Sequence, residues 1–178
     1  MKLTIFNGSP RGKKSNSKIL IEQFVRGFTV TGWNTCQVHY LNRINDSENL
    51  ARAFEEAECV LLATPLYTDA MPGLVKAFIE TLEPYVGRTN NPPIGFIVQS
   101  GFPEAAHSRP LERYFEKLAA RLDSPYLGTI VKGGVEGIQI QPEKMTRKLF
   151  DTFYRIGLHF GETGAFDQDL IQSLAKPE

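Results

Sequence analysis

Apolar and polar positions along the chain form two alternating kinds of segment. Short runs that are apolar throughout or at every second position, typical of strands, occupy residues 2–6, 35–41, 59–64, 94–99 and 126–131. Segments with apolar residues at every third or fourth position, typical of helices, occupy residues 18–28, 47–57, 72–83, 109–122 and 142–160. The regular alternation predicts an open, parallel, doubly wound α/β sheet of five strands, with helices on both faces in three layers.

The sequence also indicates where two of the predicted helices begin or end and where the domain ends. Ser15 or Ser17 is expected to cap the beginning of the first helix, and Gly161 the end of the last. The pattern weakens after that helix. We therefore expect one domain over residues 1–164 and a C-terminal tail, residues 165–178, that is an exposed arm or contacts a partner.

The charge balance and the cysteines exclude several classes of protein. Lys plus Arg and Asp plus Glu both number 20, so the formal net charge is zero. This balance argues against a nucleic-acid binder with a basic face and against an electron carrier with a strongly acidic docking surface. Cys36 and Cys59 lie in or beside apolar runs without Cys-x-x-Cys spacing, so we expect buried small side chains rather than a metal site or a disulfide.

Two observations bear on location. No apolar run approaches the roughly 20 residues that a membrane span requires. The first residues include one early lysine and lack the long apolar core of a signal peptide. We therefore expect a soluble, cytoplasmic protein.

The loop after the first predicted strand has the composition of an anion site. It leads into a helix, whose first turn presents unpaired backbone N–H groups and the positive end of the helix dipole. The spacing fits neither a P-loop nor the dinucleotide fingerprint, which leaves a phosphate monoester on another cofactor. The side-chain donors of this loop are Ser9, Arg11, Ser15, Asn16 and Ser17.

Two further loops are expected to meet this one, because ligands of such sheets bind beyond the carboxyl ends of the strands, where the strand order reverses. One contains Pro65-Leu66-Tyr67, a rigid turn with apolar and aromatic surface. The other contains Ser100-Gly101-Phe102, in which glycine permits close backbone approach. A flat, largely apolar ring system with a phosphate tail fits the three loops, and FMN has that shape. Backbone N–H groups of residues 66–67 or 101–102 are expected to face the flavin N1–C2=O edge.

In order and spacing these motifs resemble the flavodoxin-like NAD(P)H-dependent FMN reductase family over roughly residues 1–140. The motifs are Gly8-Ser9-Pro10-Arg11 with Ser15-Asn16-Ser17, Thr64-Pro65-Leu66-Tyr67 with Met71-Pro72-Gly73, and Ser100-Gly101-Phe102. The resemblance implies a flavodoxin-like fold, FMN as cofactor, NAD(P)H as electron donor and a homodimer. It assigns the phosphate to Ser9, Arg11, Ser15, Asn16 and Ser17, and the isoalloxazine to Pro65, Leu66, Tyr67, Ser100, Gly101 and Phe102.

The implied reaction is hydride transfer from NAD(P)H to bound FMN and onward to a small-molecule acceptor such as a flavin, a quinone or an azo compound. Because the cofactor supplies this chemistry, no catalytic side chain is assigned, and Glu104 and His107 are expected to have other roles. Residues 41–47 contain no cysteine where one branch of the family carries an iron–sulfur cluster, so no such cluster is expected. A non-enzymatic FMN-binding electron carrier or redox sensor, and a cofactor-free interaction module, remain alternatives. The Gly133-Gly134 turn is compatible with closing over the flavin or with simply turning the chain.

Overall fold

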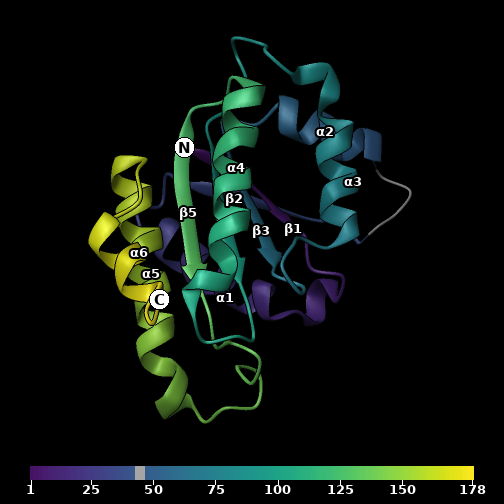
Figure 1. Cartoon of the computed structure of the whole chain (residues 1–178). Coiled ribbons are helices and arrows are strands. Elements are labelled where there is room, and N and C mark those ends of the chain that lie inside the picture. The colour runs from purple at the N-terminus through teal and green to yellow at the C-terminus, as the bar shows by residue number, and fades with distance from the viewer. Residues whose placement is uncertain (43–46) are drawn as a thin grey trace.

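The structure, a computed structural model, describes residues 1–42 and 47–178. Its centre is a parallel five-stranded sheet in the order β2-β1-β3-β4-β5, with helices on both faces (Figure 1). The predicted doubly wound, three-layer α/β fold is confirmed. The strands are β1 (Lys2–Asn7), β2 (Thr35–Tyr40), β3 (Cys59–Pro65), β4 (Ile94–Gln99) and β5 (Tyr126–Lys132).

Helices follow each strand, and short 3-10 turns (η) complete the connections. The α-helices are α1 (Asn16–Phe28), α2 (Ser47–Glu55), α3 (Gly73–Thr81), α4 (Arg109–Leu122), α5 (Glu143–Thr163) and α6 (Gln168–Leu174). The 3-10 turns are η1 (Gly12–Lys14), η2 (Glu83–Tyr85) and η3 (Ala105–Ser108).

Each face of the sheet has its own apolar layer, because successive side chains of a strand point to opposite faces. In β1, Ile5 packs with α1 and α5, whereas Phe6 packs with α2 and α3 on the other face. On that second face Phe96 of β4 stacks on Phe115 of α4, with ring centroids 4.2 Å apart. Strand β3 is buried along its whole length, as its uninterrupted apolar run predicts.

The end of α5 differs from the prediction. Gly161 does not cap the helix, which continues to Thr163 and ends at Gly164, a residue with φ +75°. Gly161 instead lies against α1, where a Cβ atom would be 2.7 Å from the carbonyl oxygen of Phe28. Close packing between the two helices therefore requires a residue without a side chain at this position.

The segment after residue 164 does not extend as an exposed arm. It forms α6, which Asp167 caps by accepting a hydrogen bond from the Leu170 N–H. Phe166, Ile171 and Leu174 are buried in the apolar layer shared with α1 and α5. Of the two alternatives for this tail, the exposed arm is wrong: these apolar side chains recur at helical spacing together with Leu170 and cover β5.

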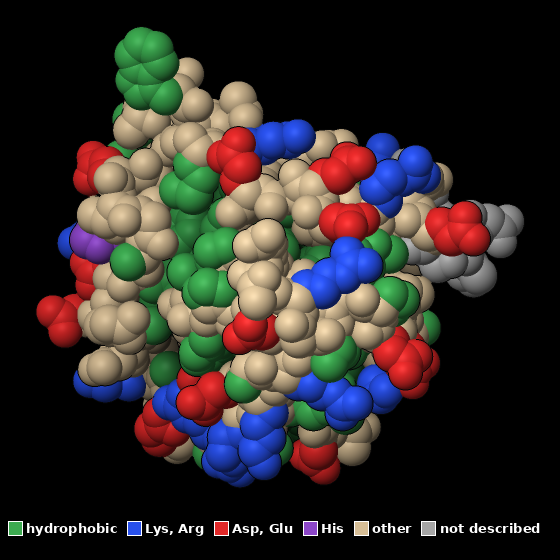
Figure 2. Space-filling model, turned by 90° about the horizontal axis from the view of Figure 1, so that it is seen from above, with side chains coloured by type: hydrophobic (Ala, Val, Ile, Leu, Met, Phe, Trp, Pro, Cys, Tyr) green, Lys and Arg blue, Asp and Glu red, His purple; other side chains and the backbone are tan. Residues whose placement is uncertain are grey.

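Figure 2 shows the face at the amino ends of the strands. Acidic and basic side chains are interspersed there, beside a band of hydrophobic side chains. This mixture agrees with the zero net charge of the sequence and gives this face no field of a single sign. Among the described helices, none qualifies as a membrane span.

Candidate functional site

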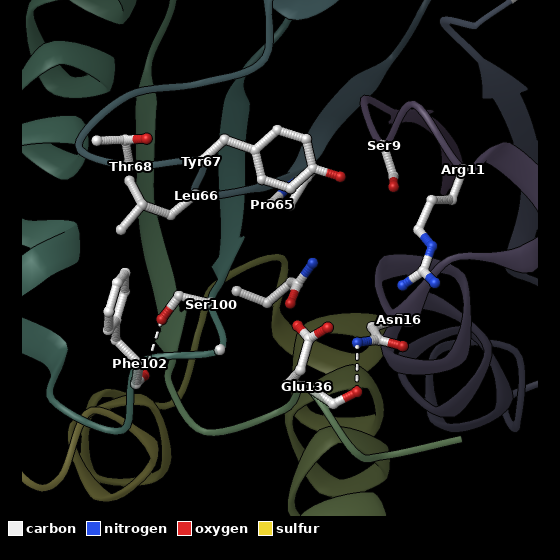
Figure 3. Close-up of a pocket in the computed structure, with 12 residues that line it drawn as sticks. Ser9, Arg11, Asn16, Pro65, Leu66, Tyr67, Thr68, Ser100, Phe102 and Glu136 are labelled. Atoms are coloured by element: carbon white, nitrogen blue, oxygen red, sulfur yellow. Dashed lines mark hydrogen bonds between the residues drawn. The ribbon is translucent and has the colours of Figure 1, made fainter. Parts of the chain in front are cut away.

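A pocket of about 560 Å³ lies at the carboxyl ends of the strands, where the strand order reverses between β1 and β3 (Figure 3). Four loops, those after β1, β3, β4 and β5, contribute to it. Nine of the eleven predicted site residues line it: Ser9, Arg11, Asn16, Pro65, Leu66, Tyr67, Ser100, Gly101 and Phe102. The pocket is also lined by three residues outside that prediction: Thr68, Gln99 and Glu136.

Local hydrogen bonds fix the loop after β1. Gly8 donates its N–H to the carbonyl of Ala63 at 2.7 Å, which joins the loop to the end of β3. A Cβ atom on Gly8 would lie 2.3 Å from Cγ2 of Val75, so only glycine fits there. Ser9 donates its N–H to Oδ1 of Asn7 at 3.0 Å. The loop is thus shaped by its own polar groups and by the helix packed beneath it.

The structure separates two kinds of role among the predicted phosphate donors. Ser15 caps α1: its Oγ accepts from the Lys18 N–H and donates to the Gly12 carbonyl. Ser17 Oγ accepts a hydrogen bond from Nε2 of Gln99 at 3.3 Å, which joins α1 to the end of β4. Neither residue lines the pocket, so their hydroxyl groups support the loop rather than face its centre.

Asn16 lines the pocket, but its side chain is also engaged. Its Nδ2 donates to the carbonyl of Val135 at 2.9 Å, with a longer contact of 3.4 Å to that of Glu136. Its Oδ1 accepts from Nε2 of Gln139 at 2.8 Å. The amide therefore connects the beginning of α1 to the loop after β5, and its backbone N–H is the group left for an anion.

Two polar side chains at the pocket end formed by the loop after β1 remain available to bind a ligand. Ser9 is 2% exposed, and its Oγ makes no hydrogen bond with any described residue. The Arg11 guanidinium is exposed on the pocket rim and forms no ion pair within the described part of the chain. Together with the first backbone N–H groups of α1, they form a donor set suited to a phosphate.

The loop after β3 forms the opposite end of the pocket. The Leu66 N–H donates to the Gln99 carbonyl at 2.8 Å, and the Tyr67 N–H donates to the Ala70 carbonyl at 2.9 Å. Both groups are therefore engaged, contrary to our expectation that they face a flavin edge. Thr68, the first residue of the tight turn between Tyr67 and Ala70, has φ +57°, a conformation that costs a β-branched residue free energy.

The loop after β4 is braced by the loop after β5. The Val135 N–H donates to the Ser100 carbonyl at 3.0 Å, and the Gly134 N–H donates to the Phe102 carbonyl at 2.8 Å. A Cβ atom on Gly133 would lie 2.4 Å from the Phe102 carbonyl oxygen, which requires glycine. Neither glycine lines the pocket, so this turn positions Ser100 and Phe102. The N–H groups of Gly101 and Phe102 make no backbone hydrogen bond among the described residues and remain candidates for a flavin edge.

The remaining candidates lie apart from the pocket. Glu104 Oε2 lies 3.8 Å from Nε2 of His107, whose ring packs against Phe102, and neither residue lines the pocket. Burial raises the pKa of the Cys36 thiol to about 12 and that of the Cys59 thiol to about 11. Within residues 1–42 and 47–178, no group of three or more His, Cys, Asp or Glu side chains is arranged for a metal. The sequence argument against an iron–sulfur cluster concerns residues 41–47, most of which lie outside the described residues.

The donor set of the pocket fits FMN. Phosphate donors gather at one end, and Leu66, Tyr67 and Phe102 supply apolar and aromatic surface at the other. The volume of about 560 Å³ lies within the range of small-molecule and cofactor sites. Tyr67 is 47% exposed and Phe102 49% exposed, so both rings stand at the rim with a face available for stacking.

Solved structures with the same fold include three flavin enzymes. An FMN-dependent NADH-azoreductase from Bacillus anthracis, in complex with FMN, has a TM-score of 0.69 at 12% identity, covering 90% of this chain and 100% of that chain. An NAD(P)H:quinone oxidoreductase from Methanothermobacter marburgensis has a TM-score of 0.70 at 15% identity, and the match covers 90% of this chain and 96% of that chain. An NADH:FMN oxidoreductase in its apo form has a TM-score of 0.67 at 14% identity, and the match covers 99% of this chain and 96% of that chain. At these identities the likeness shows the fold.

Sequence comparison identifies the family. No curated protein matches the chain. The family model described as NADPH-dependent FMN reductase matches residues 1–129, which include the loops after β1, β3 and β4. The chain therefore belongs to the NADPH-dependent FMN reductase family and is an FMN-dependent oxidoreductase.

Proposed function

We propose that this protein accepts a hydride from NAD(P)H on FMN held in the pocket and passes the electrons to a small-molecule acceptor, with a quinone, an azo compound or a free flavin as the acceptor class. The observation that carries the proposal is the polarity of the pocket. Its two available phosphate donors, Ser9 and Arg11, lie at one end, and its aromatic rim, Tyr67 and Phe102, lies at the other. Bound FMN supplies the hydride and electron chemistry.

The chain's own groups are proposed to bind and orient. Arg11, Ser9 and the first N–H groups of α1 hold the phosphate. Pro65, Leu66 and Tyr67 line one side of the ring, and Ser100, Gly101 and Phe102 the other. The free N–H groups of Gly101 and Phe102 are proposed to donate to the N1–C2=O edge and to stabilise negative charge on the reduced ring. Ser15 and Ser17 act through the loop that they support.

We further propose a homodimer in the cytoplasm, where NAD(P)H is available. Two half-exposed aromatic rings at the pocket rim leave one side of a bound ring open to solvent in the single chain. A second copy covering this rim excludes water from the reacting face. Light scattering on the FMN-loaded protein tests the assembly. A dilute monomer with full activity contradicts it.

The deciding experiment is spectroscopic and kinetic. The purified protein is titrated with FMN, and the oxidation of NADH and of NADPH is then followed with excess free FMN, a benzoquinone or an azo dye as acceptor. We expect saturable FMN binding and steady oxidation of at least one nucleotide. FMN binding without steady NAD(P)H oxidation for any acceptor assigns the protein to the electron carriers instead, and failure to bind FMN refutes the proposal altogether.

A further inference from the structure

We propose that Glu136 binds the ribityl chain of the flavin, with its carboxylate accepting hydrogen bonds from the ribityl hydroxyl groups. The inference rests on the proposed function, because it requires FMN in the pocket. It assigns a ligand-binding role to a residue that lies outside the three loops that sequence reasoning identified and outside the matched residues 1–129.

The position of Glu136 is intermediate between the two ends of the pocket. In Figure 3 its carboxylate points into the cavity between Asn16 and Arg11 on one side and Ser100 and Phe102 on the other. The side chain lies across Gly101: a Cβ atom there would be 3.3 Å from Oε2 of Glu136. With the phosphate proposed at Arg11 and the ring between Tyr67 and Phe102, this carboxylate lies where we place the chain that joins phosphate and ring.

The backbone that carries Glu136 is held firmly. On its amino side, Val135 is 1% exposed and donates to the Ser100 carbonyl. On its carboxyl side, Ile138 is 4% exposed in the apolar layer beneath α1. The Asn16 amide binds the carbonyls of residues 135 and 136, while Gln139 donates to the Lys14 carbonyl at 2.9 Å. The backbone at Glu136 is therefore held on both sides, while its side chain is exposed toward the pocket with its carboxylate unpaired among the described residues.

Charge and hydrogen-bonding capacity then select the partner. The Glu136 carboxylate forms no hydrogen bond or ion pair with any described residue, although Arg11 lines the same pocket. An ionised carboxylate only accepts hydrogen bonds, and it repels a phosphate. The ribityl chain offers several hydroxyl donors and no charge. These donors match the free oxygen atoms at the place where the chain passes, and bonds to an ionised acceptor are the stronger kind.

The test compares three flavins that share the same ring. FMN has the ribityl chain and the phosphate, riboflavin has the chain alone, and lumiflavin has neither. Dissociation constants are measured by flavin fluorescence for the full chain and for Glu136→Gln, which keeps the size and removes the charge. Glu56→Gln, at an exposed position after α2, is the matched control. We expect Glu136→Gln to raise the dissociation constants of riboflavin and FMN by about three- to tenfold, because a neutral acceptor forms weaker hydrogen bonds. The dissociation constant of lumiflavin should not change.

Each outcome decides the matter. Unchanged riboflavin affinity in Glu136→Gln overturns the proposal. An equal loss for lumiflavin also overturns it, since the carboxylate would then contact the ring. Tighter FMN binding with unchanged riboflavin would place the carboxylate beside the phosphate instead. If the unaltered chain binds none of the three flavins, the proposed function fails and this inference with it, an outcome distinct from a failure of Glu136 alone.

Discussion

A Cβ atom on Gly157 of α5 would lie 1.9 Å from the carbonyl oxygen of Phe24 in α1. Gly27 of α1 stands in the reciprocal relation to the carbonyl of Tyr154 in α5, also at 1.9 Å. The two helices therefore cross with their backbones in contact. This crossing fixes α1, whose first turn forms the phosphate end of the pocket, so helix packing far from the pocket determines the geometry at its edge.

Gly157→Ala is expected to destabilise the protein by about 3 kcal/mol, because the rigid backbone of the opposite helix must move to admit a methyl group. Gly73→Ala is the control. Gly73 begins α3 without positive φ, and nothing lies within 4 Å of the place that an alanine methyl group would occupy, so alanine is expected to stabilise by about 0.5–1 kcal/mol. Urea unfolding followed by circular dichroism measures both. Equal stability of the two variants would refute the close crossing.

Arg11→Ala is expected to weaken FMN binding by about 10- to 100-fold, the effect of losing charge-assisted hydrogen bonds. Riboflavin, which lacks the phosphate, should bind the variant and the unaltered protein equally. Lys13→Ala is the control, since Lys13 is exposed in the same loop but does not line the pocket. Fluorescence titration gives the constants. Unchanged FMN affinity in Arg11→Ala removes Arg11 from the phosphate site.

Thr68→Gly is expected to raise the free energy of unfolding by about 1 kcal/mol, because glycine adopts φ +57° without the steric cost that a β-branched residue bears. Asp123, which ends α4 with the same φ of 57°, provides the comparison. Aspartate tolerates this conformation better than threonine, so Asp123→Gly should raise the free energy of unfolding by less than Thr68→Gly does. Thermal unfolding of both variants tests this order. A loss of stability in Thr68→Gly would show that the threonine side chain compensates for its strain.

The two cysteines are expected to be inert in the folded protein at pH 8. Burial raises both pKa values, to about 12 for Cys36 and about 11 for Cys59, so the reactive thiolate is scarce. An aromatic disulfide reagent should label both thiols after unfolding in guanidinium chloride and neither before. Cys59 is buried and Cys36, contrary to the sequence prediction, only half-buried. Fast labelling of both thiols in the folded protein would contradict the raised pKa values.

The raised pKa values of the two thiols also determine how the free energy of unfolding changes with pH. The unfolded thiols, with an ordinary pKa of 9.0, lose their protons before the folded ones do. The free energy of unfolding is therefore expected to fall as the pH rises above about 9. Urea unfolding at about pH 8 and pH 10 measures this fall, which should be smaller in the double variant Cys36→Ala/Cys59→Ala. An identical pH dependence of the two proteins would contradict the contribution of the thiols.

The sequence was sufficient for the sheet and for the meeting of three loops. Strands such as β3 and β4 are buried on both faces, so their apolar runs are uninterrupted and their limits clear. The rule that ligands bind at the reversal of strand order then predicts which loops meet. Nine of the eleven predicted residues do line one pocket.

The particular use of each polar side chain was beyond sequence reasoning. Serine and asparagine hydroxyl and amide groups bind nearby backbone as readily as a ligand, and Ser15 and Asn16 do so here. Glu136 was missed because its place depends on contacts with Asn16, 120 positions earlier in the chain. One sequence signal did point toward Glu136. The Gly133-Gly134 turn directly follows a predicted strand, and paired glycines there indicate that the loop after β5 packs closely against the loop after β4.

The two ends of the described chain differ in their distance from the pocket. The amino group of Met1 binds Oδ1 of Asn34 at the amino ends of the strands. Near the other end, the Pro177 carbonyl accepts from the Ala105 N–H at the beginning of η3, and Glu178 pairs with Arg109. An affinity tag fused after Glu178 would thus emerge beside the turn that follows Phe102, whereas one placed before Met1 would leave the ligand entrance clear.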